Sequence, residues 1–167
     1  MSRTSLAAGA VLAVAARAAL PRLLRLKFAR DVTALNRGDH RGLLSSYADD
    51  AVLRFHDGDH RWAGDWVGRD GIDAFLRNLT TAGFQGSIGD VSVSGPPWAM
   101  TVMARFDDHV DGPDGERLYE NRTVLVLRTR WGKVVEHEDF YADTGEIVAL
   151  DRRLTALGVA PVPRPRP

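Results

Sequence analysis

The stretch ALNRGDHRGLLSSYADDAVL, residues 34–53, carries the signals that decide the fold. It completes a helical pattern, and the glycine of Asn36-Arg37-Gly38 is typical of the residue that follows a helix end. Asp39 suits the cap of a short second helix, and residues 51–57 then alternate between apolar and polar, as a strand does. The chain therefore begins its domain with two helices that lead directly into a strand.

The rest of the chain is predicted to form a run of strands, interrupted by one helix and followed by a closing helix. A second strand is predicted over 60–68, and a helix follows from Asp70 to Gly83. Longer strands are then expected over 87–95, 97–110, 117–130 and 133–143, with a final helix over 145–158. This order predicts an α+β fold, in which helices cover one face of a curved, mostly antiparallel sheet.

Composition excludes several classes of function. The 167 residues include 22 basic and 22 acidic side chains, so no basic excess favours a nucleic-acid partner. The absence of cysteine excludes disulfides, thiolate metal sites and cysteine catalysis. No glycine-rich phosphate loop is present, and the turn with His56 and His60 matches no helical two-histidine motif. We therefore expect no cofactor and no metal.

The two ends of the chain differ from its middle. Residues 1–27 form an apolar, alanine-rich extension, whose apolar run over 6–20 is interrupted by Arg17 and is short for a bilayer span. Two interpretations stay open: a helix that packs on or extends from a cytoplasmic domain, or an export signal or membrane contact. The proline-rich tail, residues 159–167, is predicted to be disordered.

Three segments carry a resemblance to a known superfamily: residues 34–53, the helix after VGRDGI, and the closing GKVVEHEDFYAD. With them, the chain over residues 28–158 resembles the NTF2-like superfamily, and within it the SnoaL-like and limonene-epoxide hydrolase branches. The resemblance implies a cone in which the sheet curls around an internal pocket closed by helices. It also implies that every second residue of the long strands points inward.

Alternation along the long strands selects the candidate site. One set contains Thr101, Met103, Arg105 and Asp107, and two others contain Tyr119, Asn121, Thr123 and Leu125, and Val135, His137, Asp139 and Tyr141. Charges on inward faces must be paired, and an arginine can hold two carboxylates at once. Two carboxylates that share an arginine titrate differently, so that one serves as an acid and the other as a base.

The resemblance to limonene-epoxide hydrolases implies a role for each of these charges. Arg105-Phe106-Asp107 looks like the family's first motif, and residues 137–141 look like its second. Asp139 would then be the base that activates water, Asp107 the acid, and Arg105 the bridge. The family's water-holding tyrosine and asparagine are replaced here by Leu53 and Phe55.

The remaining candidates surround this centre. His137 is either a further catalytic base or a hydrogen-bonded core histidine. The predicted substrate contacts are Asn121, Thr123, Tyr141, Met103, Trp62 and Phe55, although packing in the core would equally explain the tryptophan.

These residues favour a small-molecule enzyme that works by acid–base hydrolysis or isomerisation without a cofactor. The alternatives are a SnoaL-like cyclase, in which Asp139 or His137 removes an acidic proton, and a non-catalytic binding or assembly module with the same fold. A homodimer is expected, because the outward set on the long strand places Val124 and Val126 among Glu120, Arg122 and Arg128.

Overall fold

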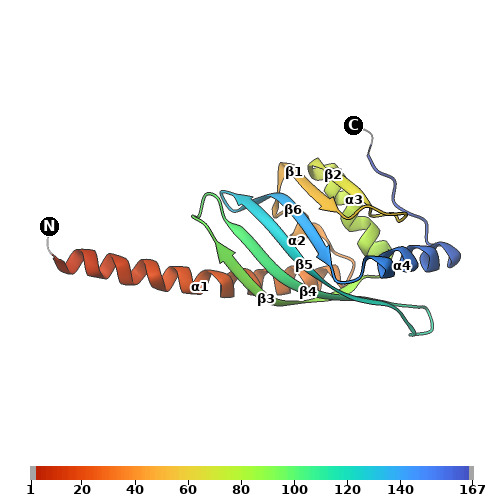
Figure 1. Cartoon of the computed structure of the whole chain (residues 1–167), viewed down its shortest axis with the longest axis horizontal. Coiled ribbons are helices and arrows are strands. Elements are labelled where there is room, and N and C mark those ends of the chain that lie inside the picture. Colours follow the sequence, from red (N-terminus) through yellow and green to blue (C-terminus); the bar gives the residue numbers. More distant parts are fainter. Residues whose placement is uncertain (1–2, 166–167) are drawn as a thin grey trace.

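The structure is a computed structural model that describes residues 3–165, with side chains described from residue 19 onward. Four helices and six strands follow one another in the predicted order (Figure 1). The helices are α1 (Arg3–Leu35), α2 (Arg41–Leu44), α3 (Gly68–Thr81) and α4 (Thr144–Ala156). The strands are β1 (Tyr47–Phe55), β2 (Gly64–Val67), β3 (Gln85–Ser94), β4 (Thr101–Asp111), β5 (Arg117–Arg130) and β6 (Lys133–Tyr141).

The six strands form a single curved sheet in the order β2-β1-β6-β5-β4-β3. Only β1 and β6 run parallel, and every other neighbouring pair is antiparallel. Because β6 closes the meander beside β1, the first and last strands of the domain meet at the middle of the sheet. The predicted α+β cone is confirmed.

Helix α3 packs on β1 and β2 through one apolar face. Ile72, Phe75 and Leu76 are buried there, and the Phe75 ring lies 5.6 Å from that of Trp66. The chain enters α3 through Gly68, whose φ of 71° is a left-handed conformation that favours glycine. Burial of this face against β1 and β2 builds the main hydrophobic core.

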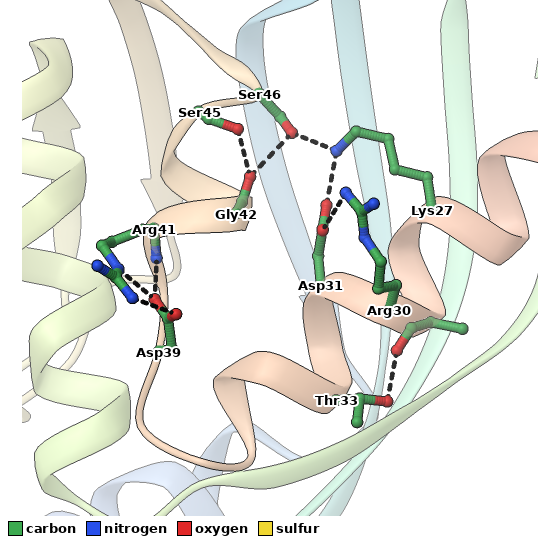
Figure 2. Close-up of polar contacts among 10 residues, drawn as sticks. Lys27, Arg30, Asp31, Thr33, Asp39, Arg41, Gly42, Ser45 and Ser46 are labelled. Carbon is green, nitrogen blue, oxygen red and sulfur yellow. Dashed lines mark hydrogen bonds and ion pairs between the residues drawn. The ribbon is translucent and has the colours of Figure 1, made fainter.

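The long helix α1 lies against β3, and its N-terminal half extends beyond the sheet (Figure 1). A part-buried ion pair fixes its C-terminal half: Lys27 Nζ lies 2.6 Å from Asp31 Oδ2 and donates to Ser46 Oγ over 2.6 Å (Figure 2). Arg25 also donates to the carbonyl of Gly89 on β3. Within the described residues, no helix has the length and apolar character that a membrane span requires.

The C-terminal tail lies against the domain as far as it is described, which differs from the disorder predicted for residues 159–167. Asn78, fully buried on α3, accepts from the backbone N–H of Val162 and donates to its carbonyl. The guanidinium of Arg164 lies 4.0 Å from the ring centroid of Trp66. The last two residues of the predicted tail, 166 and 167, lie outside the described residues.

Candidate functional site

Strand β4 presents the opposite face to the interior from the one predicted. Its even-numbered residues point inward, and the buried ones among them are Val102, Ala104, Asp108 and Val110. Phe106 also points inward, and its ring packs so closely on Gly86 of β3 that a Cβ at that position would lie 2.1 Å from Phe106 Cζ. The alternation was therefore recognised correctly, but its phase was wrong by one residue.

Arg105 and Asp107 consequently lie on the outer face of the sheet. Their side chains are 50% and 42% exposed, and they form an ion pair with each other at 3.0 Å. Asp139 instead contacts His137, so the predicted arginine bridge between Asp107 and Asp139 is wrong. Met103, a predicted substrate contact, is likewise on the outer face and is 49% exposed.

An apolar cavity of about 90 Å³ lies between the sheet and helices α1–α3. Most of its wall is aliphatic or aromatic, and it includes Phe28, Leu43, Leu79, Phe106 and Leu127. Polar side chains meet it in one region, where Tyr47, His137, Asp139 and Tyr141 line it together with Ser46. A mainly apolar cavity with a few convergent polar groups is the usual form of a small-molecule site.

Three of these polar residues form a continuous line of hydrogen bonds. The Tyr47 hydroxyl lies 2.6 Å from His137 Nδ1, and His137 Nε2 lies 2.8 Å from Asp139 Oδ1. All three side chains are buried. Burial raises the pKa of Tyr47 well above its usual value, so this hydroxyl keeps its proton and donates to Nδ1. With Nδ1 as the acceptor, Nε2 carries the proton that His137 donates to Asp139.

Asp139 keeps one carboxylate oxygen free of protein donors. Within the described residues, its only side-chain hydrogen bond is the one from His137 to Oδ1. Since Asp139 lines the cavity, Oδ2 is available to a ligand there. A carboxylate that is oriented on one oxygen and free on the other can accept a proton from a bound molecule.

A second carboxyl, Asp108, lies beyond Tyr141 and was missed by the sequence analysis. It is 2% exposed, and it accepts from the hydroxyls of Tyr119 and Tyr141 at 3.3 Å and 3.1 Å. Burial raises the pKa of Asp108 to about 7, despite the two tyrosine donors. Asp108 therefore changes between its neutral and charged forms near neutral pH.

The other predicted contacts are divided between the interior and the surface. Thr123 is buried, and its hydroxyl has no partner within the described residues. Asn121 donates to the carbonyl of Asp143 before α4 rather than facing the cavity. Phe55 and Trp62 are packed in the hydrophobic core and do not line the cavity.

A sequence signal existed for one of the two groups that the prediction missed, Asp108, and not for the other, Tyr47. Val102, Ala104, Phe106 and Val110 form an apolar alternation on β4, and Asp108 is the one charged residue in phase with them. An isolated carboxyl within an apolar series indicates a buried functional or structural group. Tyr47 had no comparable signal, because its meeting with His137 depends on how β1 and β6 pair.

Known structures share this fold. An NTF2-like protein of unknown function from Burkholderia pseudomallei is 26% identical with a TM-score of 0.59, over 76% of this chain and 96% of that one. A cystatin-like-fold protein of unknown function from Xanthomonas campestris is also 26% identical, with a TM-score of 0.59, over 72% and 92%. TerC, crystallised with polyporic acid, is 20% identical with a TM-score of 0.56, over 77% and 98%.

Sequence comparison identifies the family within this fold. None of the curated proteins matches the chain significantly. The family model of the SnoaL-like domain matches residues 28–137, which is most of the folded domain. The chain therefore belongs to the SnoaL-like domain family.

Proposed function

We propose that this protein is a cofactor-free enzyme that moves a proton on a small apolar molecule, with Asp139 as the base. The observation that carries the proposal is the hydrogen-bonded line from Tyr47 through His137 to Asp139, at the wall of an otherwise apolar cavity. Asp139 lines that cavity, so its free carboxylate oxygen can reach a bound molecule.

The favoured reaction is abstraction of a proton from carbon beside a carbonyl group. The C–H bond breaks as an O–H bond forms on Asp139 Oδ2, and the electron pair moves to the carbonyl oxygen, giving an enolate. Returning the proton to another position isomerises the molecule, and attack by the enolate carbon on a second carbonyl closes a ring. Membership in the SnoaL-like family, which includes polyketide cyclases and isomerases, supports this chemistry.

Epoxide hydrolysis has less support from the geometry. That reaction needs an acid for the departing oxygen as well as a base for water. Arg105 and Asp107, which were predicted to supply the acid and its partner, lie on the outer face of the sheet. Among the described residues, Asp139 is the only carboxyl that lines the apolar cavity.

The ligand that fits is small and mainly apolar. The cavity of about 90 Å³ is below the roughly 300 Å³ at which drug-sized ligand sites begin. A larger substrate would have to displace lining side chains, such as Phe28 on α1 or Leu43 on α2. We assign the protein to the cytoplasm, where its substrate would be a metabolite rather than a membrane lipid.

The direct test is proton exchange into enolisable ketones dissolved in heavy water, followed by NMR. With the native chain, the ketone should incorporate deuterium at the carbon beside its carbonyl group. Asp139→Asn should remain folded, and its rate of exchange should be lower by about 100-fold or more. Arg105→Ala is the matched control, and it should keep normal exchange because its charge lies outside the cavity. If a broad set of ketones binds but none exchanges, the non-catalytic binding function replaces this proposal.

A further inference from the structure

The loop between β1 and β2, residues 56–63, contains an unusual concentration of unpartnered polar atoms. Among the described side chains, seven buried nitrogen or oxygen atoms have no hydrogen-bond partner, and five of them belong to this loop. They are His56 Nε2, His60 Nδ1, Arg61 Nη1, Arg61 Nη2 and Trp62 Nε1. Since buried polar groups in native proteins are nearly always satisfied, this clustering points to something that the loop binds.

Arg61 is the centre of the cluster. Its side chain is only 2% exposed, and its Nε donates to Asp151 Oδ1 on α4 over 2.5 Å. This contact uses one of the five guanidinium N–H groups and leaves both terminal nitrogens without a partner. A buried guanidinium with unpaired nitrogens destabilises the fold unless a further group accepts hydrogen bonds from them.

Trp62 adds another donor beside the arginine. The Arg61 guanidinium lies 5.5 Å from the centre of the Trp62 ring, and the indole N–H is buried without a partner. Guanidinium and indole groups can only donate hydrogen bonds, so neither can satisfy the other. What completes the pair must therefore be an acceptor.

Two histidines border the same donors. His60 Nε2 and His56 Nδ1 lie 3.4 Å apart, and the His60 ring centroid is 6.4 Å from that of Trp62. Each ring still has one nitrogen free of protein partners. Because the two rings share one hydrogen bond, only one of the two free nitrogens carries a proton when both rings are neutral, so one of the histidines can donate to the same acceptor.

We propose that Arg61 and Trp62, flanked by His56 and His60, form a binding site for an oxyanion, which is a carboxylate or a phosphate group. The two terminal guanidinium nitrogens match the spacing of two oxygens on such a group, and the indole N–H supplies a further donor. None of these four residues lines the apolar cavity, so the site is separate from the Asp139 centre and goes beyond the proposed function.

The loop itself is the route by which an anion enters. Its middle residues, Asp57 to Asp59, are exposed. Gly58 in this segment lies against His60 and near Val148 of α4, the same helix that holds Arg61 through Asp151. An exposed connecting loop of this kind is the part of the region that can move without breaking the sheet.

The test measures binding of inorganic phosphate and of acetate to the full chain by calorimetry and thermal melting. The sodium salt of each anion replaces sodium chloride, so that the ionic strength stays constant. At least one anion should bind saturably and raise the melting temperature. Whichever binds more tightly identifies the group as a phosphate or a carboxylate. Arg61→Lys should weaken binding by about tenfold or more, because an ammonium cannot make the paired contact.

Two further variants keep the outcome decisive. Trp62→Phe retains an aromatic core residue and removes only the indole donor, so it should weaken binding several-fold even if Arg61→Lys does not fold. Arg54→Gln removes an exposed arginine of β1 and should leave binding unchanged. The proposal is overturned if neither anion binds saturably, which would mean that water fills the site, or if Trp62→Phe binds as tightly as the native chain.

Discussion

The hydroxyl of Tyr47 lies 2.6 Å from Nδ1 of His137 and thereby connects the first strand of the sheet with the last. The two residues are ninety positions apart in the chain, and the parallel pairing of β1 with β6 brings them together. The contact fixes which histidine nitrogen carries the proton and turns that proton toward Asp139. Tyr47 is thus a positioning residue for the proposed base.

His137→Gln distinguishes a positioning histidine from a catalytic base. Because Asp139 takes the proton, we expect the turnover rate to fall by about tenfold or more, while the acidic limb of the pH–rate profile remains. Tyr47→Phe should have a smaller effect of the same kind, since it removes only the contact to Nδ1. Loss of the acidic limb in His137→Gln would instead make His137 the base and contradict the assignment.

Asp108→Asn should change how stability depends on pH. Burial raises the pKa of Asp108 from 3.8 to about 7, so the native chain loses stability as pH rises through this interval. The variant has no such group, and at pH 8 it should be more stable by about 2 to 4 kcal/mol. Urea unfolding of both proteins between pH 4 and pH 8 measures this difference.

The pH dependence of stability in Asp108→Asn must be compared with that of the native chain, because His60 changes stability with pH in the opposite direction to Asp108. Burial and the neighbouring His56 lower the pKa of His60 to about 4, so stability is lost as pH falls from 6.5 toward 4. Both proteins share this contribution, and it cancels in their difference. Equal pH dependence in the two proteins would refute the assignment of Asp108.

Removal of residues 1–26 should leave a folded domain, whereas removal of residue 27 as well should be costly. Lys27 neutralises Asp31, whose side chain is only 3% exposed, and it also holds Ser46 (Figure 2). Its loss should reduce the free energy of unfolding by about 2 kcal/mol relative to the shorter deletion. Thermal melting of the two truncated chains measures this, and Lys27→Met in the full chain should give a similar loss.

A homodimer through the outer face of the sheet is expected. Met103, Val124 and Phe140 are exposed there on neighbouring strands, and Val124 pairs with Phe140. Phe140→Glu should convert a dimer of twice 18.3 kDa into a monomer, as measured by light scattering. Thr155→Glu places the same charge on the exposed side of α4 and should leave the dimer intact. A native chain that scatters as a monomer would refute the prediction.

Substitution of Arg105 by alanine should have little effect on the free energy of unfolding. The ion pair with Asp107 is half exposed, and such surface pairs contribute about 0 to 1 kcal/mol. Arg105→Ala should therefore unfold at nearly the same urea concentration as the native chain. A loss of about 3 kcal/mol would show that the arginine is buried with its carboxylates, as the sequence analysis predicted.

The sequence by itself determined the order of the elements and the inward faces of β5 and β6. Those properties depend on local signals, such as the glycine after α1 and the alternation that places Thr123, His137 and Asp139 inward. Family membership could be inferred for the same reason, since the residues that carry it are continuous in the chain.

Only the tertiary structure decided the face of β4 and the partners of the site. Both faces of that strand carry an aspartate, and packing of Phe106 onto Gly86 selects the face with Asp108. The contact of Tyr47 with His137 and that of Arg61 with Asp151 each join residues ninety positions apart. Such contacts follow from how strands and helices pair in space, which no local pattern of residues specifies.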